Sequence, residues 1–149
     1  MKSAELNIDI KHFFEILLVK ECNFSKYEME KLADCVVSER LYKKMKILVT
    51  GEEDNKFRFV HKGLVRQYYV FKEKEINVQF SDVNDIVVAF ASYMGHQPSD
   101  YFIEALEPAE LFTITRENMD YLMSQGPNFI SFGKKISASL CNEKSLRER

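Results

Sequence analysis

Apolar positions recur at helical spacing in two runs within the first 36 residues. In the first run they are Ile10, Phe13, Phe14, Leu17 and Leu18, and in the second they are Met29, Leu32, Ala33 and Val36. Steps of three and four residues place side chains on one face of an α-helix. The second run follows Ser25-Lys26-Tyr27-Glu28, a capping-box sequence that satisfies amide groups at a helix start. We therefore predict two helices within residues 1–36.

From about residue 37 to residue 115 the pattern changes to short apolar strands separated by charged turns. We predict strands over residues 40–42, 47–49, 57–61, 64–71, 76–80, 101–106 and 111–115. Residues 76–81 alternate most clearly, with Ile76, Val78 and Phe80 expected on the buried face. Gly63 interrupts a strand run and indicates a bulge or an unusual backbone conformation. Evenly spaced short strands with polar turns favour an antiparallel β-roll or closed barrel.

Residues 116–149 return to helical patterns. Thr115 is the expected N-cap of a short helix that Gly126 ends, and Pro127 is the expected first residue of the next helix. At 1.5 Å per residue, a helix over residues 127–149 would be about 34 Å long. Its apolar stripe comprises Phe129, Phe132, Ile136 and Leu140, which Leu146 would extend. Because such a helix outreaches a compact domain, we expect the stripe to form a homodimer interface; packing against its own roll is the alternative.

Length and charge narrow the class of protein. The 149 residues fit one α+β domain, and 21 Lys and Arg against 23 Asp and Glu give a net charge of −2. This charge produces no strong field for nucleic acid. The three cysteines are far apart and form no CxxC pair, which indicates a reducing, cytoplasmic location rather than a disulfide framework. No apolar run has the length of a signal peptide or membrane span, so no membrane partner is expected.

Residues 83–114 have the layout of a phosphate-binding cassette without its charges. A short helical pattern, the loop Gly95-His96-Gln97-Pro98-Ser99 and two strands follow one another. Phosphate capture uses amide groups at a helix start together with a fixed cation. A small-molecule site here would be lined by Ala89, Phe90, Ser99, Asp100 and Tyr101. The residue types favour the alternative, a filled roll interior in which Phe90 packs and Ser99 turns the chain.

Catalytic and metal-binding patterns are absent from the sequence. His12, His61 and His96 fall on different predicted elements, without the His-x-His pair of a cupin metal site. No Ser/His/Asp, Cys/His or paired-carboxylate arrangement stands out. We therefore expect no catalytic residue, no metal and no cofactor, and a cupin-like metalloenzyme is the remaining enzymatic alternative.

The order of elements resembles the cyclic-nucleotide-binding-like sensor domains of bacterial Crp/Fnr transcription regulators. Residues 41–52, LYKKMKILVTGE, resemble the first strands of the family and their Gly-Glu turn. Residues 57–66, FRFVHKGLVR, resemble its strand pair around an embedded glycine. Residues 97–107, QPSDYFIEALE, are similar to a form in Bacteroidetes-type members. The resemblance covers nearly the whole chain. It implies N-terminal helices over 1–36, a jelly-roll-like β-roll over 37–115, and C-terminal helices over 116–149 that include a dimer helix.

Two departures from the family bear on function. Members that bind cyclic AMP carry a Gly-Glu pair for the ribose and an arginine for the phosphate, where this chain has Val88-Ala89 and Ser99. The family also continues into a helix-turn-helix domain, which these residues do not contain, so DNA contact is expected only through such a domain. The resemblance thus implies a sensor and dimerisation domain that responds to an effector other than cyclic AMP. A ligand-free dimerisation module with a degenerate fold is the alternative.

Overall fold

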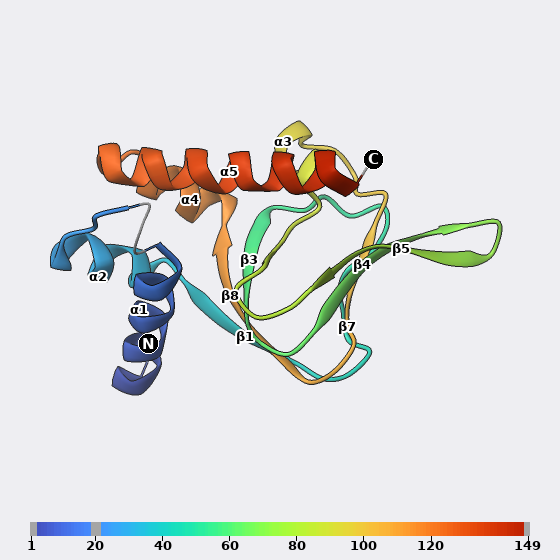
Figure 1. Cartoon of the computed structure of the whole chain (residues 1–149), viewed down its shortest axis with the longest axis horizontal. Helices are drawn as coiled ribbons and strands as arrows, with labels where there is room; N and C mark the ends of the chain where they lie inside the picture. Colours follow the sequence, from blue (N-terminus) through green and yellow to red (C-terminus); the bar gives the residue numbers. More distant parts are fainter. Residues whose placement is uncertain (1–2, 19–21, 148–149) are drawn as a thin grey trace. The chain divides into compact units, whose positions relative to one another are not determined.

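The computed structural model describes residues 3–18 and 22–147 of the chain, and their side chains except at 18, 139 and 141–147. It divides into two compact units. Residues Val37–Thr115 form one, the β-roll unit, and residues Met1–Val36 with Arg116–Arg149 form the other, the helical unit (Figure 1). Each unit is described by itself.

The β-roll unit consists of two four-stranded sheets in which every strand pairing is antiparallel. The first sheet has the order β1-β8-β3-β6 and the second β2-β7-β4-β5. The strands are β1 Val37–Leu41, β2 Lys46–Leu48, β3 Lys56–Lys62, β4 Val65–Phe71, β5 Lys74–Ser81, β6 Ile86–Val87, β7 Phe102–Ala105 and β8 Ala109–Thr115. The chain passes repeatedly from one sheet to the other, which confirms the predicted α+β class with an antiparallel, jelly-roll-like roll. The sequence pattern missed β6, because two residues are too few to show a period.

Helices begin and end close to the predicted positions. They are α1 Ala4–Leu18, α2 Lys26–Asp34, α3 Phe90–Gly95, α4 Arg116–Met123 and α5 Pro127–Arg147. The predicted capping box at α2 is confirmed: the Glu28 amide donates to Ser25 Oγ at 3.1 Å, and the Ser25 amide donates to Glu28 Oε1 at 2.8 Å. The hydrogen bond from the Ser25 amide holds the pKa of Glu28 below its ordinary value.

This capping box makes a pH-dependent contribution to stability. Because the folded pKa of Glu28 is depressed, its carboxylate stabilises the fold above its ordinary unfolded pKa, about 4.3, and loses that contribution as the pH falls through the lower folded value. We expect Glu28→Gln, which keeps the capping acceptor but removes its charge, to lower the free energy of unfolding by about 0.3–1 kcal/mol at pH 7. The difference from the wild type should shrink below pH 4. Urea unfolding at both pH values measures it, and an equal difference at pH 7 and pH 3 would contradict the ionic contribution.

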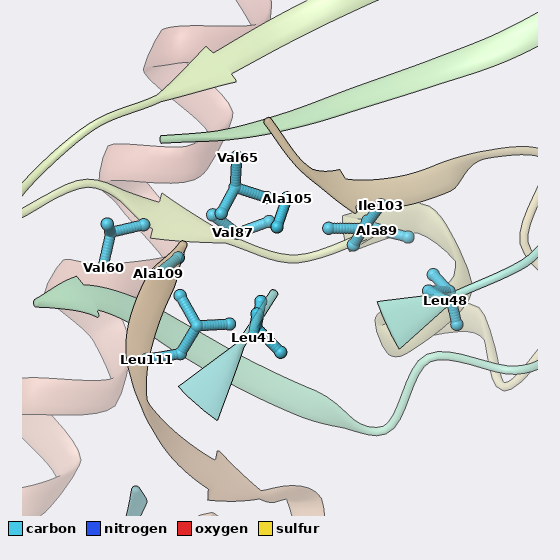
Figure 2. Packing of buried hydrophobic residues seen from close by; sticks show 10 residues of the cluster. All are labelled: Leu41, Leu48, Val60, Val65, Val87, Ala89, Ile103, Ala105, Ala109 and Leu111. Carbon is cyan, nitrogen blue, oxygen red and sulfur yellow. The ribbon is translucent and has the colours of Figure 1, made fainter. Parts of the chain in front are cut away.

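The core of the roll lies between its two sheets. Figure 2 shows ten apolar side chains from both sheets and from the start of α3, called here the core cluster. Its members are Leu41, Leu48, Val60, Val65, Val87, Ala89, Ile103, Ala105, Ala109 and Leu111. Met45, Ile47 and Tyr101 pack against it while remaining partly exposed. These residues define the inner face of each sheet.

The predicted alternation of β5 is wrong at its C-terminal half. Phe80, expected inside, is 53% exposed, whereas Ser81 is only 1% exposed. The pairing with β4 explains the change, because Gln67 lies opposite Gln79 while Tyr68 lies opposite Asn77. One extra residue therefore stands in β5 at this point. Such a bulge exchanges the two faces of a strand beyond it.

Gly63 connects β3 to β4 in a conformation that other residues rarely adopt. Its φ is +95°, and a Cβ atom here would lie 2.6 Å from the carbonyl oxygen of Pro108. The added atom would also lie 2.7 Å from Ala109 Cα. Since both contacts involve backbone atoms, the strand connection itself would have to move. The unusual conformation predicted at Gly63 is confirmed.

We expect Gly63→Ala to destabilise the chain by about 2–3 kcal/mol through steric overlap and φ strain together. Gly51→Ala is the matched control, because Gly51 has a similar φ of +97° but nothing within 4 Å of the added Cβ. That control should cost only the φ strain, about 1 kcal/mol. Urea unfolding of the two variants measures the difference. Equal losses would show that the approach of Pro108 and Ala109 carries no cost.

The apolar stripe of α5 is buried within the chain itself. Phe129, Phe132, Ile136 and Leu140 are between 0% and 7% exposed. In the helical unit, the Phe132 ring lies 6.4 Å from that of Phe14, and the Phe129 ring lies 5.0 Å from that of Phe24. Side chains this deeply buried leave no surface for a partner in this conformation of the chain, and the dimer interface over these four residues stays a prediction. Leu146 lies outside the described side chains.

Candidate functional site

A buried ion pair anchors the start of the cassette. Asp54 lies in the connection between β2 and β3, and Arg58 lies on β3, with the two residues 1% and 3% exposed. The guanidinium donates from Nη2 to Asp54 Oδ1 at 2.8 Å and from Nη1 to Asp54 Oδ2 at 3.0 Å. This two-pronged geometry is the strongest arrangement available to an arginine and a carboxylate. Arg58 is therefore committed to Asp54.

The Asp54 carboxylate also holds the cassette. Asp54 Oδ2 accepts the amide hydrogen of Ala89 at 2.8 Å, and Ser92 Oγ in α3 accepts the amide hydrogen of Asp54, also at 2.8 Å. Ser92 Oγ donates in turn to the carbonyl oxygen of Gln97. Amide groups at a helix start are those that bind an anionic ligand. Here the Ala89 amide already has an anionic partner from the chain itself.

The second end of the cassette is closed by Ser99. Its hydroxyl donates to the carbonyl oxygen of Tyr101 at 3.0 Å and accepts the Tyr101 amide hydrogen at 2.9 Å. The backbone of Ser99 pairs with Gly51 and Glu52, through bonds of 2.9 and 2.7 Å. Ser99 is 2% exposed. These contacts give it the turn-forming role that the sequence allowed.

The other predicted site residues lie in different surroundings. Ala89 belongs to the core cluster, and Tyr101 packs against that cluster. Phe90 is half-buried at the start of α3. The Asp100 side chain is exposed, while its carbonyl oxygen accepts the Thr50 hydroxyl at 3.3 Å. The structure thus brings Ala89 and Tyr101 to one cluster and leaves Asp100 in solvent, and the five-residue site stays a prediction.

Polar side chains that the sequence did not single out lie on the inner face of the second sheet. Gln67 of β4 lies opposite Ile103 of β7 and opposite Gln79 of β5, and it is 6% exposed. The Gln79 amide nitrogen donates to Ser81 Oγ at 3.0 Å and to the carbonyl oxygen of Ile86 at 3.4 Å. The one sequence signal was a glutamine within the otherwise apolar and aromatic run of β4, after Arg66.

The opposite face of this sheet carries a separate charge network. Arg66 donates to Glu104 at 2.9 Å, to Glu75 at 2.9 Å and to Asn77 at 3.0 Å. Its guanidinium also lies 3.9 Å from the centroid of the Tyr68 ring, whose burial raises the pKa of the Tyr68 hydroxyl. The Arg66 guanidinium is therefore bound to Glu104, Glu75 and Asn77, on the face of the sheet turned away from the core cluster.

Residues 3–18 and 22–147 contain no group of three or more His, Cys, Asp or Glu side chains placed to hold a metal ion. Of the helices that the structure describes, none is both long and apolar enough to cross a membrane.

Comparison with known proteins finds similarity in structure rather than in sequence. No family model and no curated protein matches the chain. The sensor domain of the transcriptional regulator DNR from Pseudomonas aeruginosa superposes with a TM-score of 0.71 at 16% identity, over 96% of this chain and 91% of that one. A cyclic nucleotide-binding domain from Methylobacillus flagellatus gives 0.73 at 17% identity, over 93% and 80%.

Other similar structures are parts of longer proteins. The regulatory subunit of a cAMP-independent protein kinase A from Trypanosoma cruzi, bound to guanosine, gives a TM-score of 0.65 at 15% identity, over 89% of this chain and 47% of that one. The chain likewise spans only 43% and 51% of two cAMP-bound protein kinase A regulatory chains. All these proteins share one architecture with the chain described here. The chain therefore has the fold of the cyclic-nucleotide-binding domains.

Proposed function

We propose that this chain is the effector-sensing domain of a Crp/Fnr-type transcription regulator, and that cyclic AMP is not its effector. The fold and the order of its elements support the first part, because the DNR sensor domain matches nearly the whole of both chains. In such a regulator, an effector bound in the roll would shift an equilibrium between two states of the protein. DNA reading would belong to a helix-turn-helix domain and not to these residues.

The observation that carries the second part is the contact between Asp54 and Ala89. A cyclic phosphate needs free amide groups and an unpaired cation, yet the Ala89 amide donates to Asp54 and the Arg58 guanidinium is bound to the same carboxylate. A phosphate placed nearby would meet an ion pair whose cation is already neutralised by Asp54, so no free positive charge would offset its own. Burying a phosphate without an unpaired cation is strongly unfavourable.

The effector that suits this interior is uncharged. The core cluster is entirely apolar, and Tyr101 adds an aromatic ring beside it. The guanosine-bound kinase subunit from Trypanosoma cruzi is a protein of similar fold whose ligand has no phosphate. We therefore propose a neutral effector with an apolar or aromatic body.

Cyclic AMP and cyclic GMP should bind at least a hundredfold more weakly than to a site that has a glutamate for the ribose and an arginine for the phosphate. Each charge-assisted hydrogen bond is worth about 1.5–3 kcal/mol. Calorimetric titration of the chain should show no heat at micromolar concentrations of either nucleotide. Saturable micromolar binding of either one would refute the proposal for the effector. Absence of any effector-dependent change with neutral compounds would instead favour the alternative, a ligand-free interaction module.

A homodimer remains part of the proposal, and the exposed side of α5 is a second candidate surface for it. On the described part of α5 the exposed side chains include Ile130, which is 39% exposed, together with Ser131, Lys134 and Lys135. This surface is mostly polar. Light scattering at several protein concentrations measures the molar mass of the chain and so shows whether it dimerises.

A further inference from the structure

We propose that the surface formed by Tyr27, Lys31, Tyr121 and Gln125 docks a segment of another protein that carries one carboxylate beside an apolar side chain. This set of residues is called here the tyrosine-lysine patch. The proposal goes beyond effector sensing and does not depend on it, since all four residues belong to the helical unit. The juxtaposition that supports it is an ammonium group between two exposed aromatic rings, with no carboxylate partner among the described residues.

Lys31 of α2 is held in place by α4 and by the turn that follows α4. Its Nζ donates to Gln125 Oε1 at 2.8 Å and lies 3.5 Å from the Tyr121 hydroxyl oxygen. The Gln125 amide nitrogen donates in turn to Ser124 Oγ at 3.1 Å, and this hydroxyl donates to the Tyr121 carbonyl oxygen at 2.6 Å. These contacts give the ammonium group a defined position on the surface. A group that is already positioned loses less conformational entropy when a partner binds.

Two tyrosine rings flank this ammonium group. Lys31 Nζ lies 4.9 Å from the centroid of the Tyr27 ring and 5.7 Å from that of the Tyr121 ring. Both rings are open to solvent, because Tyr27 is 69% exposed and Tyr121 is 46% exposed. Tyrosine is enriched at protein interfaces, where its ring buries apolar area and its hydroxyl forms a hydrogen bond. The patch therefore offers a partner ring surface together with polar groups.

The positive charge of the patch has no counter-charge within the part of the chain that the structure describes. Lys31 contacts an amide oxygen, a hydroxyl group and two aromatic rings. Two neighbouring carboxylates of α2 are committed elsewhere, since Glu28 forms the capping box and Glu30 pairs with Lys11. Hydrogen bonding to Tyr27 raises the pKa of Lys31, so the ammonium group stays charged. Charge complementarity therefore favours a carboxylate on the partner.

The surroundings of the patch favour a single carboxylate over a polyanion. Glu117 and Asp120 of α4 are exposed; Glu117 lies one helical turn before Tyr121, and Asp120 directly precedes it. Their charges repel nucleic acids and anionic membranes, which present many phosphates at once. One carboxylate next to an aromatic or aliphatic side chain avoids most of this repulsion, because it contacts the ammonium group while its neighbour covers a tyrosine ring. The occupant is therefore a protein segment that is acidic at one position.

The experiment is an NMR titration of the isotope-labelled full chain with two capped tetrapeptides, Ala-Glu-Phe-Ala and Ala-Gln-Phe-Ala. We expect the glutamate peptide to shift the resonances of Tyr27, Lys31 and Tyr121 in a saturable way, with a dissociation constant in the millimolar range. The glutamine peptide should bind about threefold to tenfold more weakly, a factor between the value of an exposed ion pair and that of a charge-assisted hydrogen bond.

Matched variants locate the binding. Lys31→Met should weaken the glutamate peptide by the same factor and remove its advantage over the glutamine peptide. Lys26→Met is the control, because Lys26 is an exposed lysine of the same helix about 140° around the helix axis from Lys31. Tyr121→Ser should weaken both peptides, whereas Tyr42→Ser, at a tyrosine of the β-roll unit that is 75% exposed, should leave binding unchanged.

The variants should all stay folded. Because exposed charge contacts are weak, Lys31→Met should change the melting temperature by no more than a few degrees. Absence of resonance shifts at roughly 10 mM glutamate peptide, or equal binding of the two peptides, would overturn the proposal. Binding of duplex DNA that depends on Lys31 would also overturn it, because the patch would then recognise phosphates. None of these results bears on the proposed exclusion of cyclic AMP, which concerns the β-roll unit.

Discussion

Asp54→Ala is expected to lower the free energy of unfolding by about 3–5 kcal/mol. The substitution leaves the Arg58 guanidinium, which is 3% exposed, without its carboxylate, and breaking one side of a buried ion pair has a cost of this size. It also removes the acceptor of the Ala89 amide. Since domains of this size are stable by about 5–15 kcal/mol, the loss is a large share of the total. Urea unfolding followed by circular dichroism measures it.

The matched control removes both charges. Arg58→Met together with Asp54→Ala should recover part of the loss, because no unpaired charge remains inside the roll. The double-mutant cycle built from Asp54→Ala, Arg58→Met and the double variant isolates the coupling between the two residues. A loss below about 1 kcal/mol for Asp54→Ala would show that the pair does not hold the cassette as the structure indicates.

Ile136→Asp is expected to unfold the helical unit rather than to separate two copies of the chain. Ile136 is 4% exposed, so the substitution removes a buried aliphatic side chain and places a carboxylate in its position. The lost packing alone is worth about 2–5 kcal/mol, and desolvation of the charge adds to it. Thermal unfolding and light scattering of the same sample distinguish the two outcomes.

Ile130→Asp is the control for this second prediction. Ile130 lies on the same helix but is 39% exposed, so its change to aspartate should alter stability by less than about 1 kcal/mol. A well-folded, monomeric Ile136→Asp protein from a dimeric wild type would restore the dimer role that the sequence suggested. Loss of the folded state supports the burial seen here.

The fold could be predicted because local patterns agree with it. Helical spacing and the Ser25 capping box located α2, and Pro127 marked the start of α5. Strand periods located most of the roll. The bulge in β5 could not be predicted, because it depends on the pairing with β4 and reverses the faces of Phe80 and Ser81 without a local signal. The direction of the α5 stripe likewise depends on tertiary packing, which spacing alone does not specify.

The candidate site was harder to predict than the fold. Asp54 occurs in a polar turn and Arg58 in an apolar strand, and nothing in their spacing shows that both are buried and paired. Ser99 was recognised as a possible turn residue, since serine forms such turns through its hydroxyl. The burial of Gln67 could not be predicted from the sequence, because it depends on the neighbouring strands. The sequence shows only that Ala89 and Ser99 stand where the family has a glutamate and an arginine. The structure adds that the Ala89 amide donates to Asp54 and that Ser99 bonds to the backbone of Tyr101.

Hydrogen exchange at the Ala89 amide tests most directly whether the chain holds its cassette with its own carboxylate. We expect this amide to be protected in the ligand-free protein, because it donates to Asp54 Oδ2 at 2.8 Å in a buried position. Addition of 1 mM cyclic AMP should leave its exchange rate unchanged. Rapid exchange in the free protein that cyclic AMP slows would contradict the proposal, since it would show an open cassette that a cyclic nucleotide closes.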